Sequence, residues 1–295
     1  MSRKKQDISH PDKTLYPEAV LSKKDVADFE ERIAEYKLPH MKDRALTFRI
    51  FPQGIEEEGF FRKRAQESYP DFIKTTTVSR HSGKEETIEM ARVQHMDDLI
   101  FFAGQNVIEY HLSLSKTHSY ETPEEIILDF DPSEDSFEKV RKAALALGKM
   151  LEDADIPAFV KTSGSRGVHV HIPLTGDADF NAAKKCAKAI AEKLCDNLPE
   201  LTTLEQRKQN RGDKVFVDWL RNDHGMTAIA PYSLRAIKGA PIATPLTWHE
   251  LENRDVTPQK YTMNNIFARL GQRDCPWNIM RQHAVSLSAV EKFLE

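Results

Sequence analysis

The chain has 295 residues, of which 40% are hydrophobic and 30% charged, and its formal net charge is -4. This composition is typical of a folded globular protein, and it excludes a disordered chain, a collagen-like chain and a polycation that binds through its overall charge. No stretch approaches the roughly 20 apolar residues of a transmembrane helix, so we expect no membrane partner. Contact with a nucleic acid would need a local basic patch, such as residues 62–64 or 207–214.

The N-terminus and the cysteines both indicate a reducing compartment. The first 13 residues, MSRKKQDISHPDK, are charged and contain no apolar segment, so we do not expect a secretory signal. Cys186, Cys195 and Cys275 are an odd number without CxxC spacing, which favours reduced thiols over disulfides or a zinc cluster. We therefore expect a cytoplasmic protein.

The first part of the chain predicts an irregular α/β lobe. ALTFRIFPQG (45–54) and GFFRKR (59–64) predict two strands joined by a turn, MDDLIFFAGQNV (96–107) a short helix, and IEYHLSLS (108–115) a further strand.

The middle of the chain predicts a β-α-β-β-α-β unit. Its four expected strands are EIILDFD (125–131), AFVKT (158–162), VHVHIPL (168–174) and KVFVDWL (214–220).

Two amphipathic helices separate these strands. The first is expected to begin at an N-cap Asp135, with Glu138 completing a capping box, and to end before Pro157; the second covers 181–198. SGSRG (163–167) predicts the turn of a hairpin between the second and third strands. Right-handed crossovers then give the sheet order fourth, first, third, second, a ferredoxin-like arrangement. After Asp223 the chain is Pro-rich and is expected to cross a surface.

Three aspartates fall on neighbouring strands of this sheet. Asp129 and Asp131 are two positions apart and face the same side of their strand, and Asp218 lies in an adjacent apolar strand. An isolated DxD before a helix is as often a turn or capping feature, but a third carboxylate in an apolar strand needs compensation. Oxygen ligands on adjacent strands favour a pair of Mg²⁺ or Mn²⁺ ions that supports phosphoryl transfer.

A histidine pair follows the turn on the other flanking strand. His169 and His171 share one face, and such a pair can bind zinc or iron or can simply be hydrogen-bonded within a sheet. The Ser and Gly residues and the arginine of 163–167 can cradle a phosphate. We therefore expect His169 to meet a triphosphate.

Several ordered motifs resemble one known family. DFDP, KTSGSRGVHVHIPL, KVFVDW and APYSLRA, together with HPDKTLYPE, LPHMKDR and GIEEEGFFRK, are similar to the polymerase domain of bacterial and archaeal ligase D, in the archaeo-eukaryotic primase superfamily. The resemblance covers about Ile8 to Leu251. It implies an α+β fold with a primase-like catalytic core built on an RRM or ferredoxin-like sheet, plus an N-terminal α/β lobe.

The resemblance also implies one two-lobed polymerase domain over 1–295. Its parts would be an N-terminal lobe at about 1–120 that binds DNA and a 5′-phosphate, a catalytic core at about 121–225, and a segment at 226–295 that completes the nucleotide site.

The implied activity is that of a template-directed nucleotidyltransferase, a DNA-directed DNA/RNA polymerase. It would prefer ribonucleotides, use NTP or dNTP, and fill gaps and extend ends in non-homologous end joining. Two Mn²⁺ or Mg²⁺ ions per site would be held by the catalytic residues Asp129, Asp131 and Asp218.

The resemblance assigns further residues to substrates. The expected nucleotide-binding residues are Ser163, Arg166, His169 and Arg235, with Lys63 and His111 nearby. The expected DNA-binding residues are Lys13 and Lys23 for a 5′-phosphate, Phe60 and Phe61 for stacking, and Arg211 for the primer end.

The chain departs from the family pattern in two respects. Many relatives carry an arginine directly before an aromatic-Pro-x-Gly turn, where this chain has Ile50; Arg49 lies one position earlier and is expected to face the other side. No ligase or phosphoesterase module follows, so we expect a stand-alone polymerase, nucleoid-associated, that works with Ku and a separate DNA ligase.

Two alternatives compete with this interpretation. A primase could start chains de novo on the same core, although the zinc module common in primases has no Cys/His counterpart here. A non-catalytic DNA end-binding protein could use an RRM-like sheet, although three buried carboxylates would repel phosphates.

Overall fold

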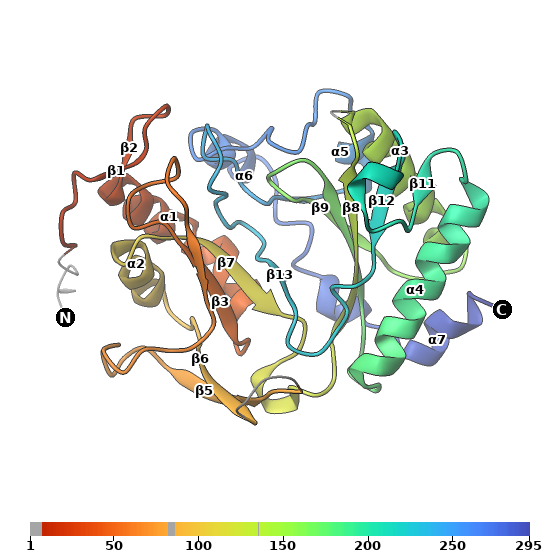
Figure 1. The fold of residues 1–295 in the computed structure, drawn as a ribbon, viewed down its shortest axis with the longest axis horizontal. Helices are drawn as coiled ribbons and strands as arrows, with labels where there is room; N and C mark the ends of the chain where they lie inside the picture. The colour runs from red at the N-terminus through yellow and green to blue at the C-terminus, as the bar shows by residue number, and fades with distance from the viewer. Residues whose placement is uncertain (1–7, 82–85, 135) are drawn as a thin grey trace.

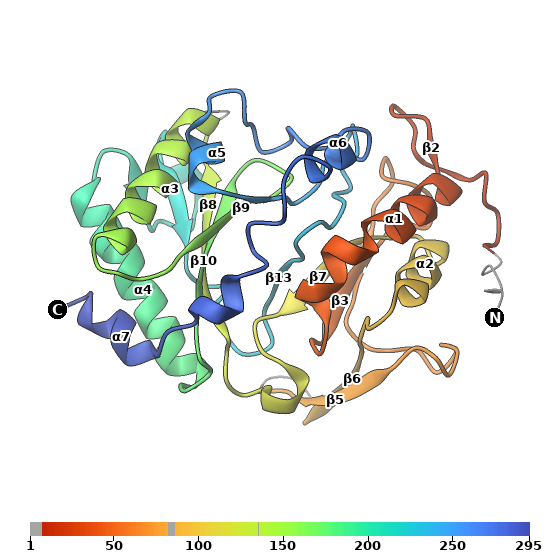
Figure 2. The ribbon, with the colours of Figure 1, turned by 180° about the vertical axis from the view of Figure 1, so that it is seen from behind.

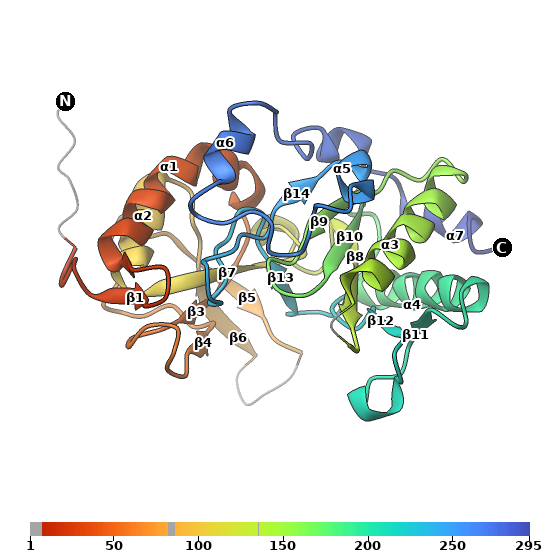
Figure 3. The same ribbon diagram turned by 90° about the horizontal axis from the view of Figure 1, so that it is seen from above.

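The computed structural model describes residues 8–81, 86–134 and 136–295, and these form two lobes that lie side by side (Figure 1). Each lobe has a central sheet, and helices lie on the outer flanks of the molecule, as the views from behind and from above also show (Figures 2 and 3). Among the described residues, no helix combines the length and the apolar character needed to span a bilayer.

The N-terminal lobe is built on a four-stranded sheet. In spatial order its strands are β13 (Thr227–Ile229), β7 (Val107–Ser113), β3 (Leu46–Ile50) and β4 (Phe60–Arg62). Helices α1 (Lys23–Met41) and α2 (Met96–Gly104) pack together, and their apolar residues share a core with Phe48, Ile50 and Tyr110 of the sheet. The strands and the short helix predicted for this lobe are therefore confirmed.

Two hairpins complete this lobe, and the sequence did not predict them. The first pairs β1 (Thr14–Tyr16) with β2 (Leu21–Ser22), and the second pairs β5 (Thr75–Ser79) with β6 (Thr87–Ala91). Helix α1 was also missed. It begins at Ser22, whose side chain forms a capping box with Asp25.

The second lobe contains the predicted β-α-β-β-α-β unit. Its sheet consists, in order, of β11 (Thr202–Thr203), β12 (Val215–Asp218), β8 (Glu125–Pro132), β10 (Val168–Pro173), β9 (Phe159–Thr162) and β14 (Pro245–Leu246). The predicted order of the four main strands is confirmed, and short strands extend the sheet at both edges.

Helices α3 (Phe137–Glu152) and α4 (Phe180–Asn197) cover the apolar face of this sheet. Leu128, Phe130, Val170 and Val217 are fully buried beneath them, as the alternation of these strands predicts. The predicted capping residue Asp135 lies outside the described residues.

The prediction that the chain crosses a surface after Asp223 is wrong. Strand β13 joins the sheet of the N-terminal lobe, and β14 then returns to the sheet of the second lobe. Between them, Tyr232, Leu234 and Ile242 are fully buried. The physical reason is that apolar residues between the prolines fill the seam between the lobes, which a count of prolines does not reveal.

The remaining helical elements are short and lie mostly near the C-terminus. They are the α-helices α5 (Trp248–Glu252), α6 (Ile266–Leu270) and α7 (Leu287–Lys292) and the 3-10 helices η1 (Thr117–Ser119), η2 (Lys208–Asn210) and η3 (Met280–His283).

Helix α1 contains a fully buried ion pair. Lys37 Nζ lies 2.8 Å from both carboxylate oxygens of Glu30, and it also lies 3.8 Å from the centre of the Tyr110 ring. Both side chains are 0% exposed. Burial raises the pKa of Glu30 and lowers the pKa of Lys37, and each charge opposes the shift of the other. The pair therefore tolerates burial only while both partners are present.

We expect Lys37→Met to lower the free energy of unfolding by about 3–5 kcal/mol, because Glu30 would keep a buried charge without a partner. Replacing both residues with methionine should bring stability back to within about 1 kcal/mol of the wild type. Urea denaturation measures both effects. The matched control is Lys24→Met, because Lys24 forms an exposed pair with Asp28 and its loss should leave the free energy of unfolding nearly unchanged. A double variant as unstable as the single one would contradict this account.

Candidate active site

Four polar residues form a row across the sheet of the second lobe. In the strand register, Asp218 lies opposite Asp129, Asp129 opposite His169, and His169 opposite Lys161. We call Asp218, Asp129, His169 and Lys161 the polar row. Because side chains alternate along each strand, the row occupies the face opposite α3 and α4 and has acids at one end and a lysine at the other.

The acidic end of the polar row is only partly neutralised. Arg221 Nε lies 2.7 Å from Asp129 Oδ2 and 3.6 Å from Asp218 Oδ2, so one guanidinium bridges two of the predicted carboxylates. Asp131 lies two residues along β8 from Asp129. Burial first, and then the charge of Asp131, raises the pKa of Asp129 to about 7. Burial also raises the pKa of Asp218. The three carboxylates thus repel one another, and the single positive charge of Arg221 does not balance their negative charge.

Three buried atoms of the polar row have no hydrogen-bond partner in the part of the chain that the structure describes. They are Asp129 Oδ1, His169 Nδ1 and Lys161 Nζ. Burial, followed by the charge of Arg235, lowers the pKa of Lys161 to about 7. Burial and the charge of Lys161 lower the pKa of His169 well below its ordinary range. Buried polar atoms rarely stay unpaired, so their concentration in one row indicates a ligand-binding site.

The acidic end fits the expected divalent cations in its chemistry. It offers carboxylate oxygens alone, which Mg²⁺ and Mn²⁺ prefer, and one of them is buried and unpartnered. The ligand atoms of the three aspartates do not all lie within 4.8 Å of one another, however, so they are not yet close enough to share one ion. Binding would therefore require the carboxylates to move together and Arg221 to give up at least one contact.

The turn between β9 and β10 is held tightly against the neighbouring strands. Ser163 Oγ accepts hydrogen bonds from the backbone N–H groups of Ser165 (3.2 Å) and Gly167 (3.1 Å). The Ser163 side chain, which the sequence predicts to contact a phosphate, therefore stabilises the turn itself. A Cβ at Gly167 would lie 1.9 Å from the carbonyl oxygen of Phe130, which only glycine avoids. Arg166 is exposed at the turn.

Arg235 connects the two lobes at this turn. It donates from Nη1 to the carbonyl of Ser163 (2.7 Å) and from Nε to Oε1 of Glu109 (3.0 Å) on β7. The other oxygen of Glu109 lies 3.1 Å from His111 Nε2. The structure thus brings His111, Arg235 and Ser163 together, as expected, and adds Glu109 as the residue that joins them.

Arg49 and Ile50 face opposite sides of β3, as alternation predicts. Ile50 is buried in the core of the N-terminal lobe. Arg49 Nη1 lies 3.5 Å from Glu109 Oε1, and its guanidinium lies 5.6 Å from the Phe61 ring centre. Arg49 therefore points to the face of the sheet that carries Glu109 and His111, toward the seam between the lobes.

The residues expected to bind DNA are placed unequally. Phe60 and Phe61 are 43% and 62% exposed, so both rings are accessible for stacking. The backbone N–H of Lys23 donates to the carbonyl of Lys13 (2.7 Å), which puts the two lysines side by side. Lys23 is buried and its Nζ donates to the carbonyls of Ser9 (2.8 Å) and Gly104 (3.2 Å), whereas Lys13 is half-buried beside Gln53.

Lys63 and Arg211 contact loops around β12. Lys63 Nζ donates to the carbonyl of Gly225 (3.0 Å), so it reaches from the N-terminal lobe to the connection after β12. Arg211 lies before β12, donates to the carbonyls of Glu205 and Gln206, and stacks 3.9 Å above the ring of Phe216. Neither side chain contacts the polar row directly.

Residues 22–277 match the protein family described as "LigD, primase-polymerase domain". The chain belongs to this family. Membership confirms the resemblance seen in the sequence motifs, the expected fold class and the expected enzyme class, a polymerase-type nucleotidyltransferase.

Individual relatives agree with the family. The chain is 31% identical over 268 residues to the bifunctional non-homologous end joining protein LigD of Bacillus subtilis, and 30% identical over 252 residues to the multifunctional LigD of Mycolicibacterium smegmatis. These matches cover 90% and 84% of the chain but only 42% and 33% of the relatives. The polymerase domain of Mycobacterium tuberculosis ligase D, solved in complex with DNA, superposes with a TM-score of 0.87 at 27% identity, covering 96% of this chain and 100% of that one.

Three residues of this LigD-type site were missed in the sequence. Lys161 was recognisable in principle, because it is the one charged residue of an apolar strand directly before the SGSRG turn. Glu109 alternates with His111 on one face of its strand, which is a weaker signal. No sequence pattern identified Arg221, apart from its position three residues after Asp218.

Glu109 makes the stability of the LigD-type fold dependent on pH. Burial alone would raise its pKa, but the hydrogen bond with His111 and the charge of Arg235 lower it from 4.5 to about 2. A carboxyl group whose pKa is lowered by folding stabilises the protein above its unfolded pKa, and this contribution disappears as the pH falls toward the folded pKa.

We therefore expect Glu109→Gln to destabilise the protein by up to about 3 kcal/mol at pH 7. The difference from the wild type should shrink steadily between about pH 5 and pH 2. Urea denaturation at a series of pH values measures the difference, and Glu58→Gln, at an exposed position, serves as the control. A difference that stays constant over this pH range would show that the charge of Glu109 has no such role.

Proposed function

We propose that the chain is a template-directed nucleotidyltransferase that fills gaps and extends ends in non-homologous end joining. It adds nucleotides to a primer 3′-hydroxyl, prefers ribonucleotides, and uses two Mn²⁺ or Mg²⁺ ions. The relatives are named for non-homologous end joining, and the superposed M. tuberculosis domain was solved with DNA, which supports DNA as the partner of this chain.

The observation that carries the proposal is the polarity of the polar row. Its acidic end offers Asp129 Oδ1, which accepts no hydrogen bond from the described residues and lies 3.4 Å from His169 Nε2. Its other end offers His169 Nδ1 and Lys161 Nζ, which have no hydrogen-bond partner among the described residues. A nucleoside triphosphate with bound divalent cations matches this arrangement, because its metal ions carry positive charge and its phosphates carry negative charge. A surface that only holds single strands has no need of buried carboxylates.

The proposed roles follow from these positions. Asp129, Asp131 and Asp218 would hold the cations, which when bound supply activation of the primer hydroxyl and stabilisation of the leaving pyrophosphate. His169, Lys161 and Arg166 would bind the phosphates, while Ser163 and Arg235 fix the turn that presents them. His111 and Lys63 would lie on the nucleotide side of the seam. Arg221, which now bridges two aspartates, would offset part of the negative charge of the acidic end until a cation binds.

Primer extension by the Asp129→Asn/Asp131→Asn variant tests this assignment. We expect its rate to fall by at least about 10³-fold, while binding to gapped DNA with a 5′-phosphate changes little. A matched control is Asp153→Asn/Asp155→Asn, which removes two equally spaced carboxylates from the exposed turn after α3. Normal extension by the first variant would refute the catalytic assignment.

The same assay resolves the finer parts of the proposal. Gap filling is compared with rNTP and dNTP, with Mn²⁺ and Mg²⁺, and with and without a primer, and the proposal expects ribonucleotides to be preferred and a primer to be required. Synthesis of dinucleotides without a primer would favour the primase alternative. Ku and a separate DNA ligase are proposed as partners at the same ends, in the nucleoid.

The positions of Lys13 and Lys23 generate a separate prediction about 5′-phosphates. Lys13→Gln should weaken binding to gapped DNA with a 5′-phosphate by about tenfold and leave binding to the 5′-hydroxyl form unchanged, because a charge-assisted contact is lost. Fluorescence anisotropy measures both affinities. Lys24→Gln is the control, since Lys24 is an exposed neighbour on α1. Equal losses for both DNA forms would mean that Lys13 does not recognise the phosphate.

A further inference from the structure

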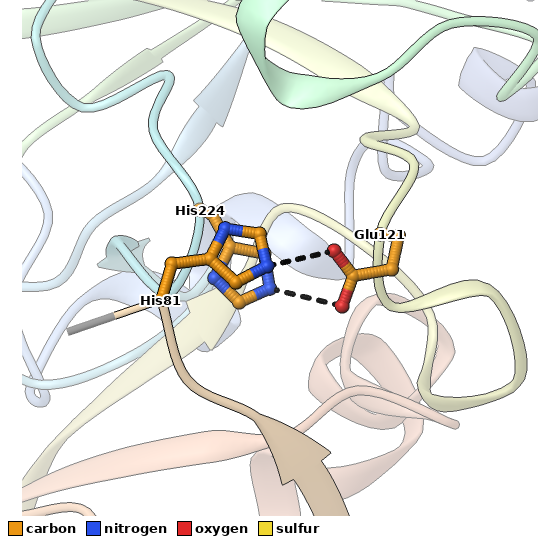
Figure 4. A group of neighbouring side chains, drawn as sticks. All are labelled: His81, Glu121 and His224. Carbon is orange, nitrogen blue, oxygen red and sulfur yellow. Dashed lines mark ion pairs between the residues drawn. The ribbon is translucent and has the colours of Figure 1, made fainter. Parts of the chain in front are cut away.

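A cluster of metal-binding side chains lies apart from the polar row. His81 follows β5, Glu121 precedes β8, and His224 lies in the connection between β12 and β13 (Figure 4). One ligand atom from each residue lies within 4.8 Å of the other two. Within the described ranges, no other group of three His, Cys, Asp or Glu side chains is this compact.

Both histidines face the carboxylate of Glu121. His81 Nε2 lies 3.1 Å from Glu121 Oε2, and His224 Nε2 lies 3.3 Å from Glu121 Oε1. Figure 4 shows both imidazole rings directing a nitrogen at the same carboxylate. In a tetrahedral zinc site with Zn–N distances of about 2.0–2.1 Å, neighbouring ligand atoms lie about 3.3 Å apart. The two separations between a histidine nitrogen and a carboxylate oxygen, 3.1 and 3.3 Å, are close to that value.

His224 is held in place before any ligand arrives. Its side chain is only 5% exposed, and its ring makes edge-to-face contacts with Tyr120 (5.3 Å) and Phe180 (5.5 Å). Ser79 Oγ lies 3.2 Å from the same nitrogen, His224 Nε2, and also hydrogen-bonds to Glu121, so an incoming ion would take the place of the contact between Ser79 and His224.

His81 has the freedom that capture of an ion needs. The two rings are stacked with their centres 3.6 Å apart and their planes 7° from parallel. A bound metal lies in the plane of each ligating ring, so the rings must tilt apart when an ion enters. The side chains of His81 and Glu121 are 62% and 55% exposed, so both can adjust around the fixed His224.

We propose that His81, Glu121 and His224 bind one Zn²⁺ ion at a site separate from the catalytic carboxylates. Two imidazoles and one carboxylate with an open fourth position suit Zn²⁺ and exclude a preference for Mg²⁺ or Ca²⁺, which take oxygen ligands. The alternative is that the two stacked histidines donate both Nε2–H groups to the carboxylate of Glu121 and bind no metal.

The ion would connect three separate parts of the chain. The β5–β6 hairpin of the N-terminal lobe supplies His81, the segment before β8 supplies Glu121, and the connection after β12 supplies His224. That connection also carries Arg221, which bridges Asp129 and Asp218, and Gly225, whose carbonyl accepts from Lys63. Zinc at this site would therefore fix the hairpin against the segment that shapes the acidic end of the polar row.

The test is metal binding by the full chain after removal of metal with a chelator. Calorimetric titration with Zn²⁺, and titration with Co²⁺ followed by its visible absorption, should give one ion per chain. His81→Ala and Glu121→Gln should each weaken binding by at least about tenfold. Because both positions are exposed, these variants should fold, which circular dichroism verifies. Hydrogen exchange in residues 86–91 of the hairpin should slow when Zn²⁺ is added to the wild type.

Two controls separate this site from other metal-binding groups. Asp129→Asn/Asp131→Asn removes the predicted catalytic ligands and should leave Zn²⁺ binding unchanged, so failure of the proposed polymerase site does not affect this test. His249→Ala removes an exposed histidine that lies 3.1 Å from Glu252 in an ordinary surface pair, and it should bind like the wild type. The proposal is overturned if the wild type takes up neither metal at about 100 µM, or if His81→Ala binds as tightly as the wild type.

Discussion

The register of the four central strands determines the chemistry of this protein. One side of the sheet is apolar because it packs on two helices, so the charged residues and histidines of the four central strands face the other side. Antiparallel pairing then places Asp218, Asp129, His169 and Lys161 directly opposite one another. A shift of one residue in any strand would turn its member of the polar row into the core. The hydrophobic core therefore fixes the positions of the catalytic candidates.

A small number of polar contacts joins the N-terminal lobe to the turn between β9 and β10, beside the polar row. Glu109 accepts from Arg235, pairs with Arg49 and His111, and is itself 1% exposed. Arg235 in turn holds the turn between β9 and β10. A nucleotide bound at the turn would thus affect residues of both sheets, because Arg235 contacts both Ser163 of the turn and the buried Glu109 of the N-terminal lobe.

Much of the catalytic sheet could be predicted from the sequence because its signals are local. Alternation identified the strands, apolar periodicity identified α3 and α4, and the handedness of crossovers fixed the strand order. Strand β13 could not be predicted, because three residues have no measurable period and its partner β7 is far away in the chain. Arg221 was missed for a related reason: its contact with Asp129 depends on how the connection after β12 folds back. The burial of Lys23, which a surface lysine does not suggest, depends on carbonyls of two distant segments.

The path of β13 and β14 has a consequence for synthesis on the ribosome. The chain leaves the catalytic sheet after Asp218, adds an edge strand to the sheet of the first lobe, and returns to add the last strand beside β9. The first lobe therefore cannot complete its sheet until residue 229 has emerged, although most of its strands are made much earlier. In a nascent chain, both sheets should therefore lack a strand until late in translation, and the two lobes should then complete folding at nearly the same time. Proteins whose domains fold one after another behave differently.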